Sequence, residues 1–97
     1  MTTPLIGTIV RYTLDEYDVT AINHRRQAAV RSHPFGDIET WTHIGNWVNA
    51  GDISPAIVVY VSGEDNTVDL QVFLDGNDTH WATSRHEGVR PGEWSVR

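Results

Sequence analysis

The chain has 97 residues, of which 39% are hydrophobic and 21% charged, as is typical of one small globular domain over residues 1–97. Seven basic residues, all arginine, and thirteen acidic residues give a net charge of −6, which argues against nucleic-acid binding because that function needs basic side chains to neutralise phosphates. Cysteine is absent, which excludes disulfides and thiolate metal sites. No apolar run is long enough for a membrane helix, and Met1–Leu5 lacks the features of a signal peptide, so we expect no membrane association.

The first predicted element is a strand over Leu5–Tyr12, which is rich in β-branched and aromatic residues. Its period of two places one set of side chains on a single face: Ile6, Thr8, Val10 and Tyr12. A helix is predicted over about residues 14–31, because Thr13 and Glu16 have the spacing of a capping box with Thr13 at the N-cap.

The predicted helix carries a thin apolar stripe, made of Leu14, Tyr17, Ala21 and Ala28. Arginines at positions 25, 26 and 31 fill its last turns, where the helix dipole favours positive charge, and Pro34 predicts its end. Residues 32–51 are irregular and contain three glycines. A loop of this length is uncommon in a compact domain, so it indicates either a short strand within Glu39–His43 or a segment used for contact.

The second half predicts four strands joined by turns. Pro55–Val61 is continuously apolar and predicts a central strand covered on both faces. Val68–Leu74 alternates, with Val68, Leu70, Val72 and Leu74 facing inward. Thr79–Ser84 is expected to return with Trp81 facing inward beside Thr79 and Thr83, and Glu93–Val96 to close the sheet with Trp94. These elements predict a mainly β fold, a small SH3-like antiparallel barrel with one inserted helix.

A hairpin turn is predicted between two of these strands, at Asp75, Gly76, Asn77 and Asp78. Gly76 supplies the positive φ, and the side chains of Asn77 and Asp78 are expected to add only local hydrogen bonds. A calcium loop starting at Asp75 is disfavoured, because its sixth and twelfth positions are His80 and His86 instead of Gly and Glu.

No pattern in the chain indicates catalysis. The five histidines lack the spacing of common metal sites, and no serine lies in a nucleophile elbow. We therefore predict no catalytic residue, no metal ligand, no cofactor and no enzyme activity.

The aromatic residues are more informative, since tryptophan is enriched in binding hot spots. Trp41 and Trp47 are equally consistent with core and interface, while Trp81 and Trp94 are expected in the core. The candidate interface residues are Trp41, Trp47, Asn46, Asn49, Arg25 and Arg26.

Several segments resemble a group of small, uncharacterised proteins of tailed bacteriophages, common in phages of actinobacteria. The resemblance covers roughly residues 5–31 and 45–96. Its motifs are Ile22–Arg26, Val48–Asp52, Pro55–Val59, Val68–Asp78 and Gly92–Trp94. The group often has tryptophan-proline after the closing tryptophan, whereas Ser95 follows Trp94 here. No established activity comes with the group, so the resemblance assigns no catalytic residue.

The resemblance implies a non-enzymatic phage accessory protein that acts by protein–protein binding. We expect a virion-associated protein, either a capsid decoration or a minor structural protein, whose partner is a capsid or other virion protein and which is homo-oligomeric or bound to a lattice. Its location would be the virion or the host cytoplasm. The alternative is an intracellular anti-defence protein that binds a host factor or sequesters a small signalling nucleotide. In that case Asn46, Asn49, Asn77, His80 and the tryptophans would line a pocket, and Arg25 and Arg26 would bind phosphates.

Overall fold

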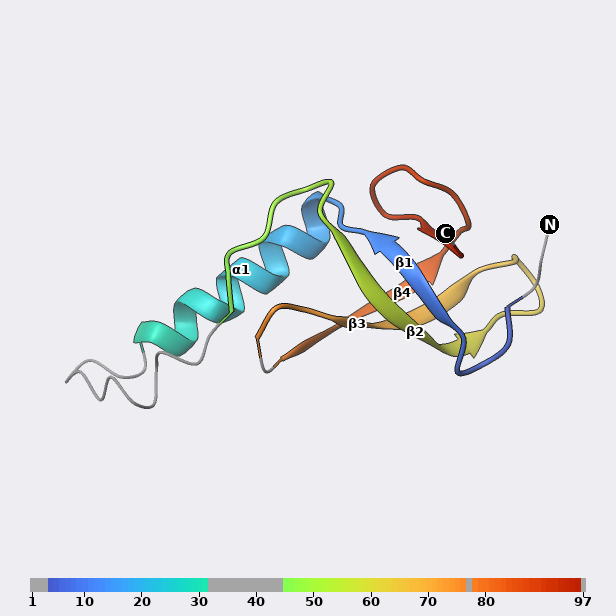
Figure 1. The fold of residues 1–97 in the computed structure, drawn as a ribbon, viewed down its shortest axis with the longest axis horizontal. Helices are drawn as coiled ribbons and strands as arrows, with labels where there is room; N and C mark the ends of the chain where they lie inside the picture. Colours follow the sequence, from blue (N-terminus) through green and yellow to red (C-terminus); the bar gives the residue numbers. More distant parts are fainter. Residues whose placement is uncertain (1–3, 32–44, 77, 97) are drawn as a thin grey trace.

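The computed structural model describes residues 4–31, 45–76 and 78–96 (Figure 1). Trp41, Asn77 and the strand considered within residues 39–43 lie outside this part. The elements in chain order are β1 (Ile9–Thr13), α1 (Glu16–Arg31), β2 (Ile53–Val61), β3 (Val68–Phe73), β4 (Thr79–Arg85) and β5 (Trp94–Ser95). The predicted mainly β architecture with one helix after the first strand is therefore confirmed.

The five strands form one antiparallel sheet in the order β4-β3-β2-β1-β5, with β2 at its centre as predicted. The sheet is open, but its two edges meet at one end. There the backbone nitrogen of Trp94 donates to His86 O (3.1 Å), Gly88 N donates to Trp94 O (2.7 Å), and the Trp94 indole donates to Arg85 O (3.1 Å). The segment after β4 is thus bonded to β5.

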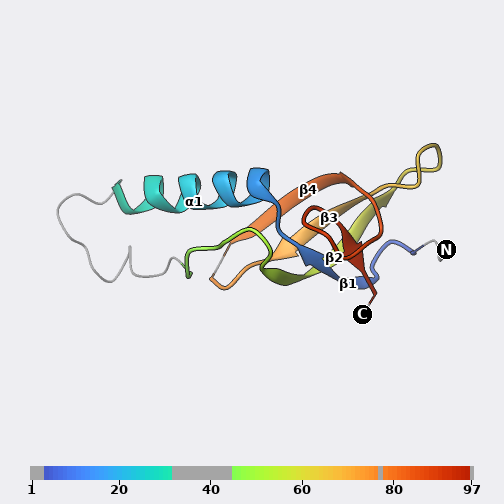
Figure 2. The same ribbon diagram turned by 90° about the horizontal axis from the view of Figure 1, so that it is seen from above.

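The core lies on the face of the sheet that α1 covers (Figure 2). The predicted inward set of β3 is confirmed, and so is the burial of Trp94. The buried apolar side chains are Val10, Tyr12, Leu14, Ile22, Ala56, Val58, Val68, Leu70, Val72, Leu74, Ala82 and Trp94. Of the residues predicted to share one face of the first strand, Val10 and Tyr12 are buried in β1, whereas Ile6 precedes the strand and is exposed.

Two predictions about the outer face were wrong. Trp81 does not face the core but is 62% exposed. The reason is the register: Leu70 pairs with Ala82 and Gln71 with Trp81, so the inward direction of Leu70 sends Ala82 inward and Trp81 outward. The central strand is also not covered on both faces, since Ile53 and Tyr60 of β2 are exposed.

The helix begins two residues later than the capping pattern predicted. Asp15 is the N-cap: its Oδ1 accepts from Asp18 N at 2.8 Å, while Asp18 Oδ2 accepts from Asp15 N at 2.8 Å. This reciprocal pair is a capping box built from two aspartates. The predicted box of Thr13 and Glu16 was wrong because Thr13 still belongs to β1.

Three of the four members of the predicted apolar stripe were wrong, whereas Leu14, just before α1, is buried. Tyr17 is 84% exposed, and Ala21 and Ala28 are exposed too. Among the α1 residues whose burial is described, 16–28, the buried ones are Asp18, Ile22 and Arg26, spaced four apart on one face. A carboxylate, an aliphatic side chain and a guanidinium therefore lie between the helix and the rest of the fold, and the partly buried Val19 also packs against the core.

Candidate functional site

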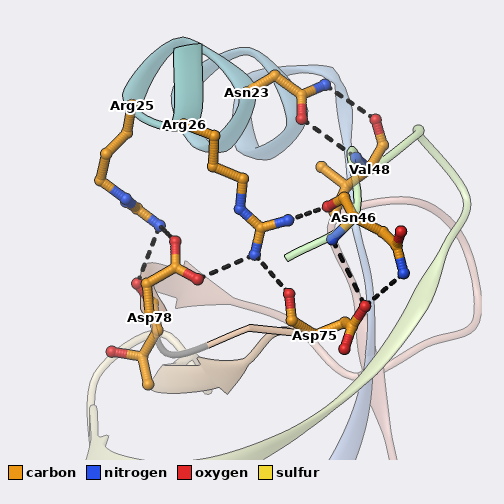
Figure 3. A network of polar contacts seen from close by, with 8 residues as sticks. Asn23, Arg25, Arg26, Asn46, Val48, Asp75 and Asp78 are labelled. Carbon is orange, nitrogen blue, oxygen red and sulfur yellow. Dashed lines mark hydrogen bonds and ion pairs between the residues drawn. The ribbon is translucent and has the colours of Figure 1, made fainter. Parts of the chain in front are cut away.

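The C-terminal half of α1 is joined to two distant segments by an arginine network (Figure 3), which we call the Arg26 cluster: Arg25, Arg26, Asn46, Asp75 and Asp78. The Nη2 atom of Arg26 lies 2.9 Å from Asp78 Oδ1 and 2.9 Å from the backbone oxygen of Asp75. Its Nη1 donates to the backbone oxygen of Asn46. Arg25 binds the other carboxylate oxygen of Asp78 at 2.8 Å. Arg26, which is 2% exposed, thus ties the β3–β4 turn to the segment before β2.

The segment at residues 45–48 is held on both sides. Asn23 donates to Val48 O (2.9 Å) and accepts from Val48 N (3.1 Å), while the backbone and side-chain nitrogens of Asn46 both donate to Asp75 Oδ2. These bonds fix the backbone on either side of Trp47. Burial alone would raise the pKa of Asp78, but the hydrogen bonds and charges of Arg26 and Arg25 outweigh it and lower that pKa, which keeps the carboxylate ionised.

A pocket of about 260 Å³ lies beside the Arg26 cluster, between the segment at residues 45–48, the start of β2 and the end of β3. Its lining residues are Asn46, Trp47, Val48, Asp52, Ile53, Ser54, Leu74 and Asp75. The indole of Trp47 and the side chain of Ile53 are largely exposed, and two carboxylates, Asp52 and Asp75, stand among these apolar groups. The pocket therefore combines an aromatic wall with negative charge.

The structure brings together two of the residues predicted at an interface, since Asn46 and Trp47 both line the pocket. Asn49 is exposed nearby but is not part of the lining. Arg25 is partly exposed, whereas Arg26 is buried and bonded within the chain, so its guanidinium is not available to a ligand at the surface. Trp41 lies outside the described residues.

A second polar group, which we call the Asp18 cluster, consists of Tyr12, Asp15, Asp18, His80 and Arg85. The Tyr12 hydroxyl donates to Asp18 Oδ2 at 2.5 Å, and His80 Nε2 lies 2.8 Å from Asp18 Oδ1. Arg85 reaches Asp15 Oδ2 at 2.8 Å and Asp18 Oδ1 at 3.3 Å, and its guanidinium lies 5.7 Å from the centre of the Tyr12 ring.

Sequence reasoning missed the Asp18 cluster. The available signal was Tyr12 on the first strand, since a tyrosine that becomes buried needs a partner for its hydroxyl. Burial is the main cause that raises the pKa of Tyr12, and the hydrogen bond to Asp18 raises it further. The hydroxyl therefore stays protonated and donates. Tyr12 and Asp18 are fully buried, which leaves no room for a substrate and makes this cluster a structural one.

The face of the sheet that points away from the core carries exposed apolar side chains on β1, β2, β3 and β4. Ile9 pairs with Ile57, Ile57 with Gln71 and Gln71 with Trp81, so one row crosses four strands. Further exposed apolar side chains on β2 and β3 are Ile53, Val59, Tyr60 and Phe73. We call this surface the outer face. It continues into the pocket through Ile53, which belongs to both.

Comparison with known proteins finds no matching family model, no curated protein and no solved structure similar to this chain. Within the described residues, no helix has the length and apolar composition to cross a membrane. In the same part of the chain, no three histidine, aspartate or glutamate side chains are grouped so that they could hold a metal ion.

Proposed function

We propose that this chain is a non-enzymatic binding protein that docks onto another protein through its outer face. The observation that carries the proposal is the set of exposed apolar side chains on the outer face, with Ile9 and Trp81 at the two ends of a row that crosses four strands. Between these two ends the row continues through Ile57 and Gln71, which are half-buried. Contiguous apolar patches of this kind mark interaction surfaces in proteins that are otherwise polar outside. Trp81, on the edge strand β4, would act as an anchor, because exposed tryptophans contribute strongly to binding once a partner covers them.

The charge of the chain indicates the chemistry of the partner. A net charge of −6 disfavours close packing of identical copies and favours a surface that carries basic residues. The carboxylates of Asp52 and Asp75 lie beside Ile53, at the edge of the outer face. An apolar centre with a charged edge is the usual anatomy of a protein–protein interface.

The resemblance to small tailed-phage proteins supports a narrower proposal: a virion-associated accessory protein, bound to a capsid or other virion protein, with an SH3-like barrel. The contact between the segment after β4 and β5 is in keeping with such a barrel. An intracellular anti-defence protein that binds a host factor would use the same outer face. Sequestration of a nucleotide gains no support, because Arg26 is buried against Asp78 and the pocket is lined by carboxylates.

Site-specific photo-cross-linking tests the proposal. Benzoylphenylalanine is placed at position 81 on the outer face, and, as the control, at position 17 on α1, where Tyr17 is 84% exposed against 62% for Trp81. We expect a cross-link from position 81 to one structural protein of the phage particle in infected cells, and no such cross-link from position 17. Mass spectrometry of purified particles should detect the chain itself. A cross-link from position 81 to a host protein, with no chain in the particles, would replace the virion assignment by the anti-defence alternative. Equal cross-linking from both positions would overturn the outer face as the interface.

A further inference from the structure

We propose that the pocket lined by Trp47, Asp52 and Asp75 is a receptor for one arginine side chain on the surface of the partner protein. This inference rests on the proposed docking function and adds to it the residue type that the partner supplies. Its basis is the size of the pocket, the state of its two carboxylates and the position of the indole.

Size separates this pocket from a small-molecule site. Its volume of about 260 Å³ lies below the ~300–1,000 Å³ that is usual for ligand pockets. A single long side chain suits a pocket of this size. The pocket also opens beside Ile53, at the edge of the outer face, so a partner that covers this face could insert one side chain.

The two pocket carboxylates differ from the other aspartates that contact α1. Asp15, Asp18 and Asp78 each have an arginine partner, at distances of 2.8 to 3.3 Å. Within the described residues, Asp52 and Asp75 have no such partner at their carboxylates. Asp52 Oδ2 accepts from Asn49 N (2.9 Å), and Asp75 Oδ2 accepts from Asn46. These bonds orient each carboxylate through Oδ2, which leaves Oδ1 to accept from an incoming cation.

The indole of Trp47 favours arginine over lysine. A guanidinium is planar, donates along a fork that matches carboxylates, and stacks on aromatic rings, whereas an ammonium is compact and strongly hydrated. Trp47 is 55% exposed, and the bonds of Asn46 and Val48 fix the backbone on either side of it. Ile53 and Leu74 in the same lining offer apolar contact to the methylene groups of the arginine stem.

The test is an NMR titration of the uniformly ¹⁵N-labelled full chain with N-acetylarginine N′-methylamide. The matched control ligand is the citrulline analogue, which has nearly the same shape but no charge. We expect saturable shifts at the Trp47 indole and at the amides of Asn46 and Asp75 with the arginine compound, and none with citrulline. Asp52→Asn and Asp75→Asn should each weaken binding by about tenfold, the loss of one charge-assisted hydrogen bond. Glu64→Gln, in the exposed turn before β3, should leave binding unchanged.

Several outcomes would overturn the inference: equal shifts with citrulline, shifts that lie away from the pocket, or unchanged affinity in both aspartate variants. Both variants keep an amide oxygen as acceptor, and their amide spectra report whether each is folded. If one variant does not fold, the other variant still tests whether the pocket binds arginine. The experiment uses a free amino acid derivative, so it is independent of the partner. Arginine binding without any cross-link from position 81 would keep the pocket and reject the docking function, and the reverse result would reject the pocket alone.

Discussion

The Nε2 atom of His80 lies 2.8 Å from Oδ1 of Asp18, which joins β4 to the first turn of α1 across 62 residues of chain. Asp18 also receives the Tyr12 hydroxyl and the Asp15 amide, and it faces the guanidinium of Arg85. One buried carboxylate therefore connects β1, the helix and β4. The stability of the helix–sheet arrangement depends on it.

Replacement of Asp18 by alanine is expected to destabilise the fold by about 3–5 kcal/mol, because it removes the acceptor of the buried Tyr12 hydroxyl and one of the two carboxylates that pair with Arg85. Urea unfolding measures the change. The matched control is Glu16→Gln in the same helical turn, where the side chain is exposed and the change should stay within about 0.5 kcal/mol. A loss below about 1 kcal/mol for Asp18→Ala would contradict the role of the cluster.

The free energy of unfolding should fall in acid because Asp18 becomes protonated there. Burial alone would raise the pKa of Asp18, but the hydrogen bonds from His80, Asp15 and Tyr12 outweigh burial and hold that pKa below its ordinary value of 3.8. Because the folded pKa is depressed, the stabilising contribution is complete above pH 3.8 and is lost as the pH falls through the lower folded value.

Urea unfolding of the wild type and of Asp18→Asn, at a series of pH values from about 7 down to about 2, tests this pH dependence. Asparagine resembles the protonated aspartic acid. The difference in unfolding free energy between the two proteins should therefore be largest at neutral pH and shrink as Asp18 becomes protonated. A difference that does not change with pH would show that the charge of Asp18 contributes nothing.

Gly76 should tolerate no larger side chain. Its φ is +135°, and a Cβ atom there would lie 2.9 Å from Gly45 N and 3.2 Å from Arg26 Nη2. We expect Gly76→Val to cost about 1–3 kcal/mol through backbone strain and this contact. Gly63→Ala is the matched control, since a Cβ at Gly63 meets nothing within 4 Å. Equal thermal stability of both variants would contradict the prediction.

Asp78 is expected to matter more than its place in a turn predicts. From the sequence, its side chain was expected to add only a local hydrogen bond, but the structure shows it bound to Arg25 and Arg26, and this expectation was wrong. Asp78→Ala leaves the buried Arg26 without its counter-charge and should cost about 1–3 kcal/mol. Glu64→Ala, an exposed acidic residue of another turn, is the control and should be neutral in urea unfolding.

Substitution of the two tryptophans expected in the core should change the free energy of unfolding by very different amounts. Trp94 is buried and its indole donates to Arg85 O, so Trp94→Ala should cost about 3–5 kcal/mol. Trp81 is exposed, and Trp81→Ser should change the free energy of unfolding by less than about 1 kcal/mol. Urea unfolding followed by circular dichroism measures both. A larger loss for Trp81→Ser would show that its side chain packs against the fold.

The strands were predictable because their side chains alternate. The inward set of β3 followed directly from the sequence, but the register of the neighbouring strands did not. The orientation of β4 was not predictable in the same way, since it depends on how the β3–β4 turn aligns Val72 with His80. The size of Trp81 pointed to the core, whereas the small Ala82 occupies the inward position.

The packing of the helix could not be predicted from hydrophobicity. Over residues 16–28 its buried side chains are Asp18, Ile22 and Arg26, and a face with two charges looks like a solvent face in the sequence. The partners of these charges lie about 50 to 70 residues away, at Asp78 and Arg85, so no local pattern reveals them. The pocket depends on the same long-range contacts, which is why only Asn46 and Trp47 were anticipated there.

The two ends of the buried helix face carry opposite charges, and each end packs against side chains of the other sign. Asp18 meets Arg85 and His80, while Arg26, two turns further on, meets Asp78. A helix with a purely apolar face can shift in register or reverse its orientation at little cost in packing free energy, because one methyl group replaces another. Here a shift by one turn would put Ile22 where a carboxylate belongs, and a reversal would set like charge against like. The helix can therefore dock in a single orientation and a single register.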